Sequence, residues 1–188
     1  MHRLLLVDDE PNVLNALRRA LRAGFEPGTL HTEALISPTQ ALERASQTKF
    51  DLVVSDFRMP EMDGVQFLQR FKKIQPLALR IMLSASAEVQ TVMRAVNDGE
   101  VLRFVVKPWL DEDLITQVRQ ALQRADELRD EHELADAMRQ QRGELSASEV
   151  ERRRLESLDP GLMHVEWGPN GEVLMPDLLD PDAFTRRR

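Results

Sequence analysis

The 188-residue chain contains neither cysteine nor tyrosine, and aromatic residues make up only 5% of it. Without cysteine it cannot form a disulfide, a thiolate metal site or a cysteine nucleophile. The apolar run near its start, Leu4 to Val7, is too short for a signal peptide or a membrane span, and carboxylates follow it at once. These absences predict a cytoplasmic protein without a membrane partner.

Excess positive charge is also lacking, since the formal net charge is -7. An acidic balance disfavours broad electrostatic binding to nucleic acid. After residue 122 the sequence shows no helix-turn-helix pattern, no basic helix and no zinc-finger spacing, and Arg186–Arg188 is too short to act as a nucleic-acid patch. No direct nucleic-acid partner is therefore expected.

Short apolar runs alternate with segments of helical period up to about residue 122. The expected strands are residues 4–7, 30–36, 51–56, 79–84 and 104–106; the expected helices are residues 11–24, 38–45, 64–74 and 89–96, with a fifth beginning after residue 109. Five strands interleaved with five helices predict an α/β fold with a parallel sheet covered on both faces. In such sheets, ligands bind beyond the carboxyl ends of the strands.

The remainder of the chain is predicted to form a helical extension and a tail. Apolar residues recur four and three residues apart, as a coiled-coil seam requires, at Leu114, Val118, Ala121, Ala125 and Leu128. Gly143 and Ser146 weaken the helix locally, and Asp159-Pro160-Gly161 ends it. Residues 164–175 have the pattern of a small hairpin. The expected units are residues 1–122, 123–157 and 158–188.

Five polar residues that can take part in catalysis or metal binding lie at the ends of predicted strands: Asp8, Asp9, Asp56, Ser84 and Lys107. Because the carboxyl ends of parallel strands meet at one edge, these side chains are expected to lie together. Three neighbouring carboxylates repel one another, and either protonation or a bound cation relieves the repulsion. An all-oxygen cluster open to water suits Mg²⁺, so the pattern predicts a divalent-metal phosphoryl site.

Within this site Asp56 is the expected nucleophile, because it stands alone at the end of a strand. A carboxylate can attack phosphorus and form an acyl phosphate. Mg²⁺ and the ammonium group of Lys107 would supply positive charge, and the hydroxyl of Ser84 can donate to a phosphoryl oxygen. A phosphatase of the haloacid-dehalogenase type would place a second Asp two residues later, where this chain has Arg58.

Each feature alone has an ordinary structural explanation. Adjacent carboxylates usually lie in a solvated turn or cap a helix, a lone Asp at a strand end is usually a turn residue, and Lys-Pro is usually a loop. Their joint occurrence at matching strand ends favours a functional site. The four histidines lack metal-ligand spacing and are expected to be surface or linker residues.

Four separated motifs closely resemble the signature of response-regulator receiver domains: Asp8–Pro11, Asp56–Gly64, Ser84-Ala85 and Lys107-Pro108. The resemblance covers residues 3 to 122 and includes every element in order. It implies a CheY-like receiver of a two-component system, with the flavodoxin-like strand order 2-1-3-4-5. It also implies that catalysis is limited to self-phosphorylation from a phosphodonor and slow self-dephosphorylation.

The resemblance assigns a role in metal binding to several residues. Asp9 and Asp56 would bind Mg²⁺ directly, and the backbone carbonyl of Arg58 would be the third protein ligand. Asp8 would act through water. Lys107 would pair with the acyl phosphate, and the peptide bond that follows it would be cis.

The resemblance also implies a conformational switch. Ser84 would move towards the phosphoryl group, and the aromatic ring of Phe104 would turn inward to fill the vacated space. Most relatives have tyrosine at this position. Because Phe104 lacks a hydroxyl group, its inward state would depend on packing alone.

A narrower resemblance concerns residues 97–104 and Lys107–Trp109, which are similar to the receivers of hydrogenase-type regulators and of regulators joined to HD-GYP cyclic di-GMP phosphodiesterases. The Gly-Ala pair that often precedes the fifth strand in that branch is absent here. This resemblance to the branch informs the signalling circuit without identifying an output.

The implied partners are a sensor histidine kinase, a downstream protein, and a second copy of the chain. The homodimer would form through the face of the fourth helix, fifth strand and fifth helix, or through the C-terminal helix. The alternative is a receiver fragment of a longer regulator, whose output domain (a cyclic di-GMP phosphodiesterase or a transcriptional domain) lies outside this chain.

Overall fold

The computed structural model describes residues 1–85, 102–142 and 146–158, and it contains a five-stranded sheet. The strands are β1 (His2–Val7), β2 (Leu30–Leu35), β3 (Leu52–Asp56), β4 (Leu79–Ala85) and β5 (Arg103–Lys107). Every neighbouring pair is parallel, and the order is β2-β1-β3-β4-β5. The predicted fold class and strand order are therefore confirmed.

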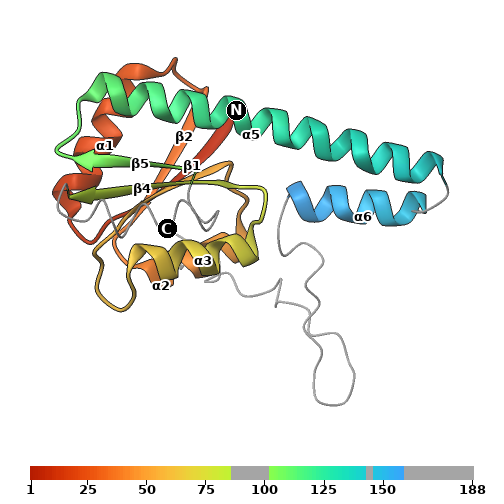
Figure 1. Cartoon of the computed structure of the whole chain (residues 1–188), viewed down its shortest axis with the longest axis horizontal. Helices are drawn as coiled ribbons and strands as arrows, with labels where there is room; N and C mark the ends of the chain where they lie inside the picture. The colour runs from red at the N-terminus through yellow and green to blue at the C-terminus, as the bar shows by residue number, and fades with distance from the viewer. Residues whose placement is uncertain (86–101, 143–145, 159–188) are drawn as a thin grey trace, which may run out of the picture.

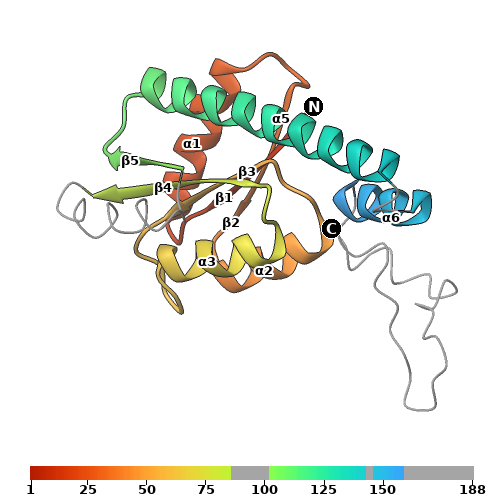
Figure 2. The ribbon, with the colours of Figure 1, turned by 45° about the vertical axis from the view of Figure 1, so that its right-hand side comes forward.

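Helices cover both faces of this sheet (Figures 1 and 2). The described helices are α1 (Pro11–Gly24), α2 (Pro38–Gln47), α3 (Gly64–Ile74), α5 (Asp111–Gln141) and α6 (Ala147–Leu158). Helices α1 and α5 lie on one face, and α2 and α3 lie on the other. Local sequence determines several helix starts. Pro11 lies in the first turn of α1, and the side chain of Asp63 accepts a hydrogen bond from the backbone of Gln66 at the start of α3.

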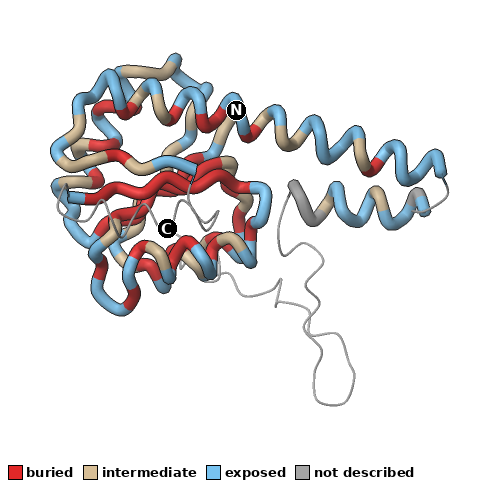
Figure 3. The backbone as a smooth tube through the Cα atoms, in the orientation of Figure 1, coloured by how far each residue is buried: buried red, intermediate tan, exposed pale blue. Residues whose placement is uncertain are grey.

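The core forms two layers, one on each side of the sheet, because alternate side chains of a strand point to opposite faces. In β1, Leu4 and Leu6 pack towards α1 and α5, whereas Leu5 and Val7 pack towards α2 and α3. All four are at most 1% exposed. The central strands are therefore buried along most of their length, as Figure 3 shows.

Most of the expected coiled-coil seam is already used inside the receiver. Leu114, Val118, Ala121 and Ala125 are at most 7% exposed and belong to the same hydrophobic cluster as Leu4. Leu128, the last residue of the seam, packs against that cluster too. The apolar stripe therefore holds α5 on the sheet and does not form a coiled-coil seam there, whereas dimerisation through the face of the fourth helix, fifth strand and fifth helix, or through the C-terminal helix, stays a prediction.

The predicted extension consists of two helices. Helix α5 continues past the amino ends of the strands, and α6 runs back alongside it (Figures 1 and 2). Arg153 of α6 donates to the carboxylate of Asp136 of α5 at 3.1 Å. At the start of α6, Ser146 accepts from the backbone N–H of Glu149, whose carboxylate accepts from the backbone N–H of Ser146. This capping box explains why a new helix begins here.

Some predictions lie outside the described residues. The expected helix at residues 89–96 and the hairpin at residues 164–175 are among them. The three domain boundaries also stay predictions. In the part of the chain that the structure describes, none of the helices combines the length and the apolar composition needed to cross a membrane.

Candidate functional site

The carboxyl edge of the sheet brings together two carboxylates and one ammonium group. The Nζ atom of Lys107, at the end of β5, lies 2.8 Å from Oδ2 of Asp8 and 2.5 Å from Oδ1 of Asp56. The Asp8 side chain is fully buried, and that of Asp56 is 10% exposed. Residues that are separated by as many as 99 positions thus meet at one point. We call Asp8, Asp56 and Lys107 the carboxyl-edge cluster.

Burial governs the electrostatics of Asp8. Desolvation raises the pKa of this carboxyl group above its ordinary value, and the nearby charge of Asp56 acts in the same direction. Two hydrogen bonds oppose the rise: one from Lys107, and one from the backbone N–H of Glu10 at 2.9 Å. The sequence does not predict the hydrogen bond from Glu10, although Pro11 at the start of the next helix indicates that the backbone is constrained there.

Lys107 experiences the opposite balance. Burial disfavours its charged form, but hydrogen bonds to Asp56 and Asp8 outweigh that effect and raise its pKa above the ordinary value. Its ammonium group is therefore held charged between the carboxylates. Two carboxylates against one ammonium group leave the carboxyl-edge cluster with net negative charge, which a further cation would neutralise.

The loop between β3 and α3 fixes the position of Asp56. The backbone N–H of Arg58 donates to Oδ2 of Asp56 at 2.8 Å, and the N–H of Gly64 donates to the carbonyl of Phe57 at 2.8 Å. A Cβ atom on Gly64 would lie 2.2 Å from the backbone oxygen of Asp56. Glycine at position 64 is thus needed for the close approach of α3 to the end of β3.

The two predicted switch residues lie on the neighbouring strands. Ser84 is 1% exposed near the end of β4, and its hydroxyl donates to the backbone oxygen of Ala85 at 3.1 Å. Phe104 of β5 is partly buried against the cluster beneath α2 and α3. The peptide bond between Lys107 and Pro108 is cis, as the resemblance implied. The movement of the two residues on phosphorylation stays a prediction.

The third expected carboxylate is placed differently from the other two. Asp9 is exposed, whereas Asp8 is fully buried. Among the described residues, no group of three or more His, Cys, Asp or Glu side chains is arranged to hold a metal ion. A site of two carboxylates and a backbone carbonyl does not require such a group. Both Asp8 and Asp56 offer oxygen atoms and share an incompletely neutralised charge, so the donor chemistry fits Mg²⁺.

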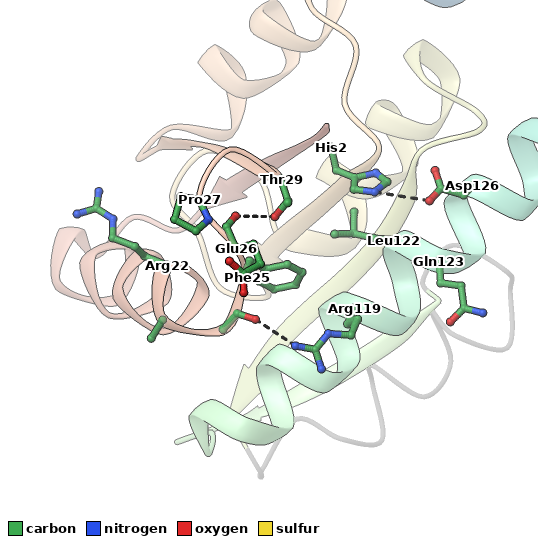
Figure 4. Close-up of a pocket in the computed structure, with 12 residues that line it drawn as sticks. His2, Arg22, Phe25, Glu26, Pro27, Thr29, Arg119, Leu122, Gln123 and Asp126 are labelled. Atoms are coloured by element: carbon green, nitrogen blue, oxygen red, sulfur yellow. Dashed lines mark hydrogen bonds and ion pairs between the residues drawn. The ribbon is translucent and has the colours of Figure 1, made fainter.

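A second concave surface lies at the opposite, amino edge of the sheet, between the end of α1 and α5 (Figure 4). This cleft has a volume of about 700 Å³. Arg119 donates to the carbonyl of Gly24 at 3.0 Å and lies over the ring of Phe25. The cleft is lined by both basic and acidic side chains, so charge does not favour one class of ligand.

Charged residues also meet next to this cleft. Arg129 of α5 donates to Oδ1 of Asp51 at 3.2 Å and pairs with Asp126 one turn earlier in the helix. Nε2 of His2 lies 3.5 Å from Asp126. We call Asp51, Asp126 and Arg129 the amino-edge cluster. This cluster connects α5 to the receiver near the point where the helix extends beyond the amino edge of the sheet.

Comparisons with known proteins agree with this geometry. The model of the response regulator receiver domain matches residues 4–119. The hydrogenase transcriptional regulatory protein HoxA of Cupriavidus necator is 31% identical over 120 residues, which are 64% of this chain and 24% of that protein. The chain thus spans about a quarter of the length of this curated relative.

Solved structures show the same likeness. The signal receiver domain of an HD domain-containing protein from Pseudomonas fluorescens Pf-5 is 34% identical, with a TM-score of 0.61, and the match covers 69% of this chain and 92% of that one. A protein described as adenylate cyclase from Rhodopirellula baltica is 32% identical, with a TM-score of 0.66, over 72% of this chain and 97% of that one. With its motifs at the carboxyl edge and a family match over residues 4–119, the chain belongs to the response regulator receiver family.

Proposed function

We propose that this chain is a phosphorylation switch in which Asp56 accepts a phosphoryl group from a sensor histidine kinase, with Mg²⁺ as cofactor. The observation that carries the proposal is the carboxyl-edge cluster, where Lys107 contacts Asp8 and Asp56 at 2.8 and 2.5 Å. A nucleophile, a charged ammonium group and a second carboxylate are thus in contact at the edge where α/β proteins bind ligands.

The chemistry follows from these positions. An oxygen atom of Asp56 attacks the phosphorus of the phosphohistidine; an O–P bond forms as the N–P bond breaks, and the histidine nitrogen keeps the bonding electrons. The chain's task is to position the carboxylate and neutralise charge. Lys107 is already in contact with Asp56 and can pair with the new phosphoryl oxygens, while Ser84 can donate its hydroxyl to one of them.

Asp56, Asp9 and the backbone carbonyl of Arg58 would hold Mg²⁺ directly, as the resemblance implies, and Asp8 would act through water. The ion supplies positive charge to the transferring phosphoryl group. On phosphorylation, Ser84 would move towards the phosphoryl group and Phe104 would turn inward.

The C-terminal helices would carry the output. Helix α5 packs on the sheet through Leu114 and Val118 and continues past the amino edge, where α6 lies against it. A change at the end of β5 can therefore reach a surface remote from Asp56 through one continuous helix. A change in dimerisation or in binding to a downstream protein would be the result.

An alternative is that the chain acts as the receiver part of a longer regulator. The observation that favours it is the comparison with HoxA, of which the matched segment makes up only 24%. Under this alternative, the phosphorylation chemistry at Asp56 is unchanged and the output belongs to another domain.

The test is phosphorylation with acetyl phosphate and Mg²⁺, followed by detection of an acid-labile phosphoryl group and by light scattering. We expect one phosphoryl group on the wild type and none on Asp56→Asn. Asp63→Asn is the matched control, because asparagine keeps the acceptor that caps α3, and we expect it to be phosphorylated normally.

The mass measurement separates the two outputs. A change from monomer to dimer on phosphorylation would support an output through the helices of this chain. Phosphorylation without a change of mass would direct the search to a protein partner or to a further domain. If the wild type gains no phosphoryl group, the proposed function is wrong.

A further inference from the structure

The loop that follows Asp56 contains a residue with an unusual backbone and a contact to a distant helix. Glu61 has a φ angle of 72°, and among the described residues it is the one non-glycine position with positive φ. This conformation favours glycine or asparagine and is unfavourable for glutamate. Within the loop, the N–H of Met62 donates to the carbonyl of Pro60 at 2.8 Å across this residue, and the Glu61 side chain adds compensating contacts outside the loop.

The compensating contacts come from the start of α2. Thr39 donates its hydroxyl to Oε2 of Glu61 at 2.6 Å, and the hydroxyl of Ser37 lies 3.5 Å from Oε1. Ser37 is also the N-cap residue of α2, so the Glu61 carboxylate lies at the positive end of that helix. These two elements are 22 residues apart in the sequence and are joined at the surface by this carboxylate.

The same loop carries the backbone that surrounds Asp56. Arg58, three residues before Glu61, donates its N–H to Asp56 and has the carbonyl assigned to Mg²⁺. On the other side, Met62 is nearly buried and Asp63 caps α3. Between Arg58 and Met62, the exposed side chain of Glu61 connects the loop to the start of α2.

We propose that Glu61 is a positioning residue, whose hydrogen bond from Thr39 holds the β3–α3 loop in the conformation that binds Mg²⁺. This inference rests on the proposed function. Without the contact, the unfavourable backbone at Glu61 relaxes, and the Arg58 carbonyl is no longer held in place beside Asp56. Glu61 itself touches neither the phosphoryl group nor the ion.

The test measures Mg²⁺ affinity by calorimetry in the absence of any phosphodonor. Thr39→Val removes the donor without changing the volume of the side chain. We expect the Kd for Mg²⁺ to rise about three- to fivefold, as loss of an exposed hydrogen bond to a charged group would give. Thr39→Ser keeps a hydroxyl and is expected to restore wild-type affinity.

A second variant separates the side chain from the backbone. Glycine adopts positive φ without strain, so Glu61→Gly removes the carboxylate but keeps the backbone accessible. Because glycine removes the strain together with the contact, we expect a smaller loss of Mg²⁺ affinity than in Thr39→Val. Glu43→Gln removes one negative charge from the exposed side of α2 and is the control for general electrostatics, with an expected Kd equal to that of the wild type.

Phosphorylation by acetyl phosphate gives an independent readout. At saturating Mg²⁺ we expect Thr39→Val to reach the maximal rate of the wild type, because positioning by the ion replaces positioning by the contact. At low Mg²⁺ its rate should fall by the same factor as its affinity. A variant with merely damaged structure would be slower at all Mg²⁺ concentrations, and that result would overturn the inference.

Failure of the inference and failure of the proposed function have different signatures. If the wild type binds Mg²⁺ and is phosphorylated but Thr39→Val binds Mg²⁺ as tightly as the wild type, or Glu61→Gly loses more affinity than Thr39→Val, Glu61 is not a positioning residue of this kind. If Glu43→Gln weakens binding as much as Glu61→Gly, net charge and not the lost contact is responsible for the effect of Glu61→Gly. If the wild type itself neither binds Mg²⁺ nor accepts a phosphoryl group, both ideas are wrong.

Discussion

The two edges of the sheet hold charge clusters of the same composition in different surroundings. In each, two aspartates share one cation. In the carboxyl-edge cluster the side chains are 0, 10 and 21% exposed, whereas in the amino-edge cluster they are 12, 41 and 39% exposed. The cation is a lysine in one cluster and an arginine in the other, but burial is what distinguishes the two most clearly.

The difference has an energetic meaning. Solvent screens the exposed pairs of the amino-edge cluster, so each contributes little to stability. In the carboxyl-edge cluster, water is largely excluded, and removing the cation leaves carboxylates without a partner, at a much larger cost. An arrangement that is costly to maintain and is placed where ligands bind is a mark of function, whereas the exposed cluster acts as a connection between α5 and the receiver.

The largest expected effect is that of Lys107→Met. It leaves Asp8 and Asp56 in contact range without a cation, so we expect the free energy of unfolding to fall by about 2 kcal/mol at neutral pH without divalent ions. Urea denaturation measures the change. Lys73→Met, at an exposed position of α3, is the matched control and should leave stability nearly unchanged. Equal losses in the two variants would contradict the distinction between the edges.

An effect of opposite sign is expected for Asp8→Asn. The folded protein holds Asp8 with a raised pKa, so its ionised form is disfavoured by folding. The neutral amide should therefore increase the free energy of unfolding by about 1 kcal/mol at pH 7, while Mg²⁺ affinity is lost. Urea denaturation and calorimetry measure the two changes.

The same variant should alter the pH dependence of stability. The pKa of Asp8 is higher in the folded than in the unfolded protein, so the protonated carboxyl group favours folding. This stabilisation is fully present at pH values below 3.8, the ordinary pKa, and is lost as the pH rises through the pKa of the folded state. The stability difference between Asp8→Asn and the wild type should thus grow with pH over that interval. A difference that is independent of pH would show that Asp8 is not strained by burial.

The smallest expected effect is that of Arg129→Gln. Loss of the partly exposed pairs with Asp51 and Asp126 should lower the free energy of unfolding by about 0.5 kcal/mol, and high salt should reduce the difference. The rate of phosphorylation at Asp56 should not change. A loss as large as that of Lys107→Met, or slower phosphorylation, would mean that the amino-edge cluster is coupled to the site.

Several features could be predicted because they depend on local pattern. The apolar runs and helical periods located the described strands and helices to within a few residues, and strand ends are where parallel sheets place their ligands. Asp8, Asp56 and Lys107 were therefore expected to meet, and they do. The division of the extension into two helices is also encoded locally, in the capping box of Ser146 and Glu149, where the sequence analysis predicts only a weakened helix.

Other features depend on contacts between segments far apart in the chain. The spacing of Leu114 to Leu128 fits both a partner helix and the chain's own sheet, and only packing shows that it faces the sheet. Adjacent aspartates look alike in a sequence, yet Asp8 is buried and Asp9 is exposed.

By itself, the sequence determined the α/β order of elements, the receiver motifs and the residues available for phosphoryl chemistry, because period and motif are properties of neighbouring residues. Only the tertiary structure decided which carboxylates share a cation, how deeply each is buried, and that Thr39 donates a hydrogen bond to Glu61, whose φ angle is positive. The physical reason is that desolvation and the compensation of backbone strain are set by all the groups that surround a residue in space.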